Sequence, residues 1–423
     1  MPPDADQVLD SPGNFQPVSE VPQGTDSNIQ NLLTSYVERA FGSSNISLSK
    51  TAAIVCTATH QPNQAPSYAL SYYAADAVSP TSVYCLGSVT KVFTGSLLVA
   101  RWLSGDDTSI MYTPNVAGVN ALLGMPPNAE GSQLTYDTTK NIYNVLLTQL
   151  ATHSACFGEI SATVMNQGLY DGGGNPSDDQ IQAWLSSASY LPQGCQLGQK
   201  STYSNWGFIT LAFALSRPSY PGASDIFNYD PALQHYVLPT FGIDPETTNT
   251  NTQANFVQGY NKAANPAPAT GLAHGLHSNV TDMSNLLLGY MTGINQYQSQ
   301  SRNPLSDLVY TAITPPLPTL PNQAYAWSLG KVGKIVPIVA KNGLTNEQGF
   351  AAWIAFAPGQ SGALLPRSNQ YEQVGVVVLV NRATSPGGPA PSVLGTDILT
   401  YLLGQPLTVW PGLEIDDPEI SDD

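Results

Sequence analysis

Residues 86–103, LGSVTKVFTGSLLVARWL, place Ser88 and Lys91 three positions apart, just ahead of an apolar run. On a helix, side chains three apart lie on the same face. A serine hydroxyl is a weak nucleophile until a neighbouring group takes or stabilises its proton. A lysine held in a dry site can do this, because burial disfavours its charged form. Ser88 and Lys91 are therefore candidates for a nucleophile and its proton partner.

The S-x-x-K spacing alone is not specific in this chain. It recurs at Ser47–Lys50, just before an expected strand, and at Ser328–Lys331, inside another. Neither pair opens an apolar helix, so neither has the setting that the Ser88 pair has.

Tyr203 and Asn205 form the only Y-x-N in the sequence, at the start of the almost wholly apolar stretch 204–216. A phenol can relay protons, and an asparagine amide can bind both a lysine and a substrate carbonyl. The alternative is a helix N-cap with a packed aromatic side chain. The residue types favour chemistry only if this segment meets Ser88 in space.

A third candidate segment is Lys341-Asn342-Gly343, between two expected strands. A lysine there could attract a substrate carboxylate, and the glycine would let a substrate lie along the strand edge. The similar triplet at 331–333, Lys-Val-Gly, shows that K-x-G is weak evidence by itself.

The elements that must position these residues fall into three groups along the chain. Apolar periodicity predicts a helix over 29–41 and another from Ser88, and alternating or continuous apolar runs predict strands near both ends of the chain. The expected strands are 51–59, 67–75, 325–332, 335–343, 349–358 and 373–381. Further helices are expected at 141–153, 178–188, 204–216, 278–293 and 391–403.

This order predicts an α/β domain built from both ends of the chain, with a helical domain inserted. We expect the α/β domain to comprise 29–88 and 325–410, and the mainly helical domain 89–324. Residues 1–28 are polar and proline-rich, without the basic start and apolar stretch of a signal peptide, and predict a disordered leader. Residues 411–423 are expected to form an acidic tail.

The composition excludes some functions. Acidic residues outnumber basic ones by 30 to 14, for a net charge of −16. Such a surface repels phosphate backbones and anionic membranes, so nucleic acid is not an expected partner. No apolar run is long enough for a membrane span. The four cysteines fit either two disulfides or four buried thiols.

Histidine chemistry and metal chemistry have little support. A Ser-His-Asp hydrolase needs a histidine base, and no G-x-S-x-G elbow accompanies the histidines. No H-E-x-x-H or carboxylate cluster predicts a metal site. The five histidines are His60, His153, His235, His274 and His277.

The three motifs taken in order, S-x-x-K, Y-x-N and K-x-G, are far more specific than any one of them. With this order the sequence resembles the penicillin-recognising serine hydrolases, which comprise class C β-lactamases, D-alanyl-D-alanine carboxypeptidases and related esterases. Segments such as LLTQLATHSA and HGLHSNVTDMSNLL extend the resemblance over roughly residues 29 to 404. The resemblance implies an α/β fold of the β-lactamase/transpeptidase type: an antiparallel sheet flanked by terminal helices, with an inserted helical domain.

The resemblance also implies roles for individual residues. Ser88 would be the acylated nucleophile, Lys91 its proton partner and Tyr203 a shared acid and base. An oxyanion hole would use the backbone N–H groups of Ser88 and Leu344. The other implied substrate-binding residues are Asn205 for the substrate amide, Lys341 for its carboxylate, Asn342 and Gly343 beside it, and Tyr260 lining the site.

Two departures from the family pattern bear on the substrate. Asn342 stands where β-lactamases usually have threonine, and the segment from Gly343 to Phe350 is slightly longer than usual. The expected function is a class C β-lactamase-like serine hydrolase. The alternatives are a D-stereospecific peptidase or carboxypeptidase, a carboxylesterase and, more remotely, a non-catalytic ligand-binding protein.

The resemblance has further implications for ligands, location and cysteines. It implies a small-molecule substrate, no cofactor and no metal. A secreted or periplasmic location is expected, although no signal peptide is visible. Two disulfides are expected in the family fold, Cys56–Cys85 and Cys156–Cys195.

Overall fold

The computed structural model describes most of the chain, and the statements below refer to that part of it. The described residues are 15–41, 52–61, 68–75, 78–104, 146–157, 196–216, 229–250, 255–260, 275–332, 336–345, 349–360, 363, 365, 370–382 and 390–405. The helix expected at 178–188 and the acidic tail 411–423 lie outside these residues.

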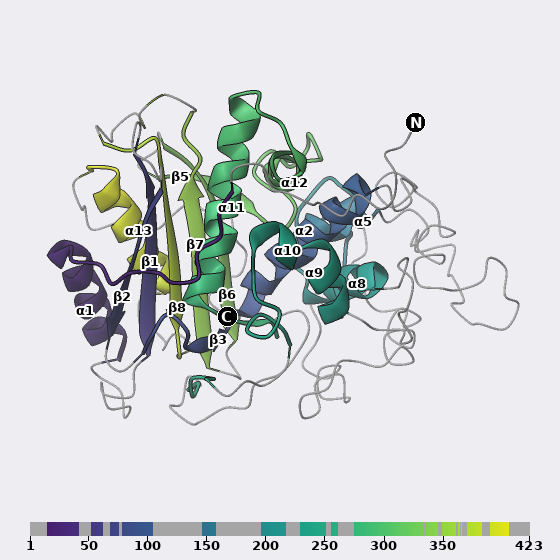
Figure 1. Ribbon diagram of the computed structural model, residues 1–423. Coiled ribbons are helices and arrows are strands. Elements are labelled where there is room, and N and C mark those ends of the chain that lie inside the picture. The colour runs from purple at the N-terminus through teal and green to yellow at the C-terminus, as the bar shows by residue number, and fades with distance from the viewer. Residues whose placement is uncertain are drawn as a thin grey trace, which may run out of the picture.

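A six-stranded antiparallel sheet forms the centre of the structure, in the order β2-β1-β8-β7-β6-β5 (Figure 1). The N-terminal hairpin therefore lies beside the last strand of the chain, which confirms the expected sheet built from both ends. Its strands are β1 Ala53–His60, β2 Tyr68–Ala75, β5 Ser328–Val332, β6 Val336–Thr345, β7 Phe350–Ala357 and β8 Gln373–Val380.

Helices cover both faces of this sheet (Figure 1). On one face lie α1 (Ser27–Phe41) and α13 (Pro391–Leu402), and on the other lies α11 (Val280–Gln298). Strand β8 shows why its sequence is a continuous apolar run. Val376 and Val378 belong to the core under α1 and α13, whereas Val377 belongs to the core shared with α11. A strand buried on both faces needs no polar alternation.

The remaining helices lie beyond α11 (Figure 1). One core is shared by α11, α2, α8 and the adjoining sheet face, so the predicted division at residues 88/89 and 324/325 does not separate two hydrophobic cores. A small two-stranded sheet of β3 (Val83–Cys85) and β4 (His277–Asn279) adjoins this block. The helices are α2 Thr90–Leu103, α5 Leu147–Ala151, α8 Asn205–Ser216, α9 Tyr229–Tyr236, α10 Leu238–Phe241 and α12 Pro304–Ile313.

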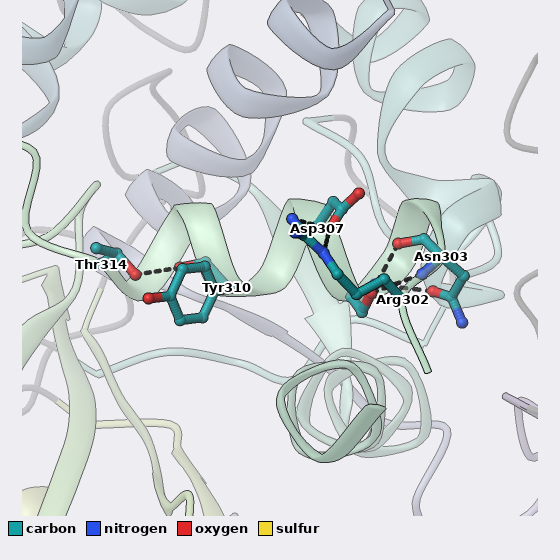
Figure 2. Close-up of polar contacts among 6 residues, drawn as sticks. Arg302, Asn303, Asp307, Tyr310 and Thr314 are labelled. Atoms are coloured by element: carbon teal, nitrogen blue, oxygen red, sulfur yellow. Dashed lines mark hydrogen bonds and ion pairs between the residues drawn. The ribbon is translucent and has the colours of Figure 1, made fainter. Parts of the chain in front are cut away.

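Local hydrogen bonds fix the start of α12 (Figure 2). This helix packs against α2 and α11. The Ser306 N–H donates to Asn303 Oδ1 at 2.9 Å, and the Asn303 N–H donates to Ser306 Oγ at 2.8 Å. This reciprocal pair is a capping box. Arg302 and Asp307 add an exposed ion pair at 2.8 Å, which contributes little because water screens it.

The predicted disorder of residues 1–28 is wrong for the part of the leader that the structure describes. Phe15 is buried, and the Val18 N–H donates to Asn285 Oδ1 at 2.8 Å. Further along, the Gly24 N–H donates to the Tyr72 carbonyl at 2.8 Å, on edge strand β2. The leader therefore covers part of an exposed strand edge, a common way of protecting it. Residues 1–14 lie outside the described part.

The predicted Cys56–Cys85 disulfide is wrong, because both residues are buried thiols that are not joined in a disulfide. Cys56 on β1 hydrogen-bonds to Ser284 of α11, whereas Cys85 on β3 hydrogen-bonds to Thr345 at the end of β6. The two thiols thus lie in different sheets with different partners. Burial raises the pKa of each to about 12.

Cys156 is disulfide-bonded. Its predicted partner, Cys195, lies outside the described residues, so the pairing of Cys156 with Cys195 stays a prediction. None of the helices in the described ranges has both the length and the apolar character needed to cross a bilayer.

Candidate active site

Ser88 is presented by a tight turn between β3 and α2. Gly87 has φ +54°, a conformation that favours glycine, and residues Gly87–Val89 form a short 3₁₀ turn that leads into α2 at Thr90. The Leu86 N–H donates to the Leu276 carbonyl at 2.9 Å, which fastens the start of this turn to β4. Ser88 itself is fully buried.

A continuous hydrogen-bond chain connects the residues of the first two motifs. Lys91 Nζ donates to Ser88 Oγ at 2.8 Å, and Ser88 Oγ lies 2.6 Å from the Tyr203 hydroxyl. The Tyr203 hydroxyl donates in turn to Asn205 Oδ1 at 3.1 Å. The structure thus brings together the pair that the sequence places three residues apart and the Y-x-N segment more than a hundred residues later.

The number of protons available limits the directions in which these hydrogen bonds can run. A neutral phenol has one proton, and here it is donated to Asn205. Ser88 Oγ accepts from Lys91, and in its contact with the Tyr203 hydroxyl either oxygen can be the donor. With the phenol proton on the Asn205 side, the Ser88 hydroxyl can donate to the Tyr203 oxygen, which is the path that activation of the serine requires.

The start of α8 positions Tyr203 and Asn205. The Gly207 N–H donates to Ser204 Oγ at 3.0 Å, so Ser204 caps the helix. The capping alternative for this segment is therefore also correct, but the cap is Ser204. Tyr203 contacts Ser88, and Asn205 accepts the hydrogen bond from Tyr203. Tyr203 is 6% exposed.

Two ammonium groups lie close to the Tyr203 ring. Lys91 Nζ is 4.9 Å from the ring centroid, and Lys341 Nζ on β6 is 5.4 Å from it. Both lysines are buried, Lys341 at 2% exposed. Two positive charges in a dry site favour negative charge on the neighbouring phenol and serine oxygens.

The third motif meets the nucleophile through its backbone. A Cβ on Gly343 would lie 2.0 Å from the Leu86 carbonyl oxygen and 3.1 Å from Ser88 N, and a Cβ on Gly87 would lie 2.6 Å from Leu344 N. Glycine is therefore needed on both sides of this contact. The close approach brings the backbone nitrogens of Ser88 and Leu344 to the same contact. Their role as an oxyanion hole stays a prediction.

His153 is a site residue that the sequence did not identify as one. Its ring centroid lies 4.5 Å from that of Tyr203 and 4.7 Å from that of Phe208, and its Nδ1 accepts the Ser204 N–H at 3.1 Å. The sequence signal was weak, because a histidine in a short helical segment has no spacing that links it to Tyr203.

The other predicted site residues are placed less directly. Asn342 lies opposite Trp353 of β7, and strand alternation puts its side chain on the other face of β6 from Lys341. The Tyr260 backbone N–H bonds to the carbonyls of Gly349 and Asn381, at the ends of β7 and β8. Roles for Asn342 and Tyr260 in substrate binding stay predictions.

The alternative motifs lack comparable settings. Ser328 and Lys331 lie on strand β5, where positions three apart face opposite ways, and Lys331 is exposed. Ser47–Lys50 lies outside the described residues. Among the histidines, His60 pairs with Glu372 at 2.8 Å, and the His277 ring packs 4.7 Å from the Phe256 ring. His274 also lies outside the described part.

A buried serine–lysine–tyrosine site between a helical block and an antiparallel sheet defines a serine hydrolase of the β-lactamase/transpeptidase-like fold. The sequence model of the beta-lactamase family matches residues 67–393, and the chain belongs to this family. A search of curated protein sequences gave no significant match.

Solved structures support the fold. A class C β-lactamase from Rhodobacter sphaeroides is 19% identical, with a TM-score of 0.57 over 88% of this chain and 98% of its own. A β-lactamase/D-alanine carboxypeptidase from Yersinia pestis is 17% identical, with a TM-score of 0.55 over 90% and 100%. An octameric penicillin-binding protein homologue from Pyrococcus abyssi is 17% identical, with a TM-score of 0.59 over 90% and 78%.

Proposed function

We propose that this chain hydrolyses β-lactams or related amides through an acyl-enzyme on Ser88, in the manner of a class C β-lactamase. The observation that carries the proposal is the buried hydrogen-bond chain from Lys91 through Ser88 to Tyr203. Membership of the beta-lactamase family supports it. So does the presence of all three motifs at one place in the fold.

In the proposed acylation, Tyr203 takes the Ser88 proton in its ionised form, which the charges of Lys91 and Lys341 favour. The Ser88 oxygen bonds to the substrate carbonyl carbon, and the C–N bond breaks. The leaving nitrogen takes the proton from Tyr203, which returns to its ionised form. Ionisation also ends the hydrogen bond to Asn205 Oδ1, so the Asn205 amide becomes available to the substrate.

The negative charge that develops on the carbonyl oxygen would be held by the N–H groups of Ser88 and Leu344. Removing one such donor typically costs ~3 kcal/mol of transition-state stabilisation. Lys341 would attract the carboxylate that penicillins and D-peptides carry. Water then cleaves the acyl–Ser88 ester, and the rate of this step separates a β-lactamase from a peptidase.

The test is incubation of the protein with a penicillin, followed by intact mass over time. A β-lactamase gives a brief adduct and free hydrolysed penicillin, whereas a peptidase-like enzyme keeps the adduct. Ser88→Ala should give no adduct and no turnover while unfolding at the wild-type temperature. Adduct formation on Ser88→Ala would contradict the assignment of the nucleophile.

The second candidate is a D-stereospecific peptidase or carboxypeptidase, or a carboxylesterase, of the same fold. Asn342 favours this candidate, because β-lactamases usually have threonine at this position of β6, next to Lys341. Hydrolysis of a D-alanyl-D-alanine peptide or an ester, without penicillin turnover, would select it. No reaction with any of these would favour the non-catalytic alternative. We also propose a secreted or periplasmic location, which the disulfide at Cys156 supports.

A further inference from the structure

His153 combines three unfavourable features at one position beside the site. Its φ is +55°, a left-handed conformation that is uncommon for residues other than glycine, although asparagine, aspartate and histidine adopt it more often than other side chains. It follows the end of α5, where glycine or asparagine is the usual residue. Such conformations persist only when the surroundings enforce them, and they are frequent at functional sites.

The second feature is the charge around the imidazole. The imidazole interacts electrostatically with Lys341 on β6 and Lys91 on α2, and the Tyr203 ring packs against it. Burial, together with the charges of Lys341 and Lys91, lowers the pKa of His153 well below its usual value. The ring is therefore neutral, and because Nδ1 accepts the Ser204 N–H, the proton is on Nε2.

The third feature is that this Nε2 atom is buried and has no hydrogen-bond partner among the described residues. An unpaired buried donor is unfavourable by ~1–3 kcal/mol. Asparagine at this position would suit the backbone and keep an acceptor for Ser204. What asparagine cannot supply is a flat ring against Tyr203.

We propose that His153 is a positioning residue, whose ring holds the Tyr203 phenol against Ser88 and whose Nδ1 fixes the adjoining backbone at Ser204. The contacts that carry this are the ring distance of 4.5 Å and the 3.1 Å hydrogen bond. Because Ser88 Oγ and the Tyr203 oxygen are only 2.6 Å apart, a small rotation of the phenol breaks the proton path. The inference depends on the proposed acid and base role of Tyr203.

The experiment measures how fast Ser88 reacts with a fluorophosphonate, which reports activation of the serine whatever the natural substrate is. His153→Asn should slow this labelling by about tenfold to a hundredfold, part of the ~100- to 10,000-fold that a positioned acid or base contributes. His153→Phe restores the ring and should recover most of the rate. If His153→Asn reacts within twofold of wild type, the proposal is wrong.

A double-mutant cycle with Tyr203→Phe distinguishes positioning from general stability. If His153 acts through Tyr203, His153→Asn changes labelling less than about twofold once the phenol oxygen is absent. An equal loss in both backgrounds would mean that His153 acts by another route. Should His153→Asn not fold, His153→Phe is compared with and without Tyr203→Phe. A loss of labelling that disappears without the phenol oxygen supports positioning, and an equal loss in both backgrounds overturns it.

His60→Asn is the matched control. The His60 and Tyr68 ring centroids lie 4.7 Å apart, much like those of His153 and Tyr203. His60, however, is the last residue of β1. Its labelling rate should equal that of wild type. If Ser88 is labelled but neither penicillins nor esters are hydrolysed, the proposed function fails while the cycle still decides the role of His153. If wild-type Ser88 is not labelled at all, both proposals fail.

Discussion

Replacing Gly343 with alanine tests the backbone contact between β6 and the nucleophile turn. The added Cβ would lie 2.0 Å from the Leu86 carbonyl oxygen, with Ser88 N and Val89 N at 3.1 and 3.0 Å. All three neighbours are backbone atoms, which cannot rotate away. The two segments must separate by roughly 1.3 Å before that contact reaches the ~3.3 Å of a normal C–H···O approach.

This separation should damage catalysis more than folding. It moves Leu344 N away from Ser88 N, and a misplacement of ~1 Å can lower the rate of an enzyme about a hundredfold. Loss of one oxyanion donor has a cost on the order of a hundredfold to a thousandfold in kcat. We therefore expect Gly343→Ala to lower kcat by about that range. The overpacking should reduce the free energy of unfolding by only about 1–3 kcal/mol.

The assay is turnover of nitrocefin, or of a p-nitrophenyl ester if that is the better substrate, beside a thermal melt. Gly207→Ala is the control, since Gly207 lies in α8 next to Tyr203 and Asn205. An added Cβ there meets its nearest atoms at an ordinary 3.7 Å. It should keep full activity and gain ~0.5–1 kcal/mol from the helix. Wild-type kcat in Gly343→Ala would refute the reasoning, because it would mean that the close contact does not define the site.

Other outcomes follow from the buried charges and thiols. Lys341→Ala should slow hydrolysis of carboxylate-bearing penicillins tenfold to a hundredfold, because it removes a charge-assisted contact that contributes ~1.5–3 kcal/mol. Hydrolysis of p-nitrophenyl acetate should be affected much less. Equal losses for the two substrates would mean that Lys341 acts in proton transfer instead. Native protein at pH 8 should resist iodoacetamide at Cys56 and Cys85, whose pKa values burial raises to about 12, and modification before unfolding would contradict their burial. As pH falls below ~6.5, His153 becomes protonated in the unfolded chain but stays neutral in the folded chain. The free energy of unfolding of wild type should therefore fall by about 1 kcal/mol per pH unit more than that of His153→Asn. Parallel curves of unfolding free energy against pH would show that His153 is not buried as a neutral ring.

The central sheet could be predicted from the sequence because its strands carry strong local signals. The run in β8 is buried on both faces, and the observed strand, Gln373–Val380, differs from the prediction by one residue. The short elements could not be predicted. Strands β3 and β4 have three residues each and exist only because they pair with each other. Helix α10, Leu238–Phe241, is too short for any apolar periodicity.

The leader shows a different limit. Phe15 and Val21 are isolated apolar residues in a polar, proline-rich segment, so composition predicted disorder. Both are buried in the structure, where Asn285, far along the chain, binds the backbone at Val18. Contacts of this range leave no periodic pattern. The wrong Cys56–Cys85 pairing has a related origin, because the resemblance implies that the two elements lie near each other but does not give the directions of their side chains.

The motifs were predictable as a set because chemistry restricts residue types, whereas the residues that hold them obey backbone rules. Gly87 and Gly343 allow two backbone segments to meet, and His153 occupies a left-handed position to present its ring. Each segment is anchored by an element that packs into the shared buried core. A single change at Ser88 should therefore alter the reaction and leave the assembly intact, while a methyl group at Gly343 should displace the assembly itself. Equal effects of these two substitutions on the unfolding temperature would show that this division between chemical and supporting residues is wrong.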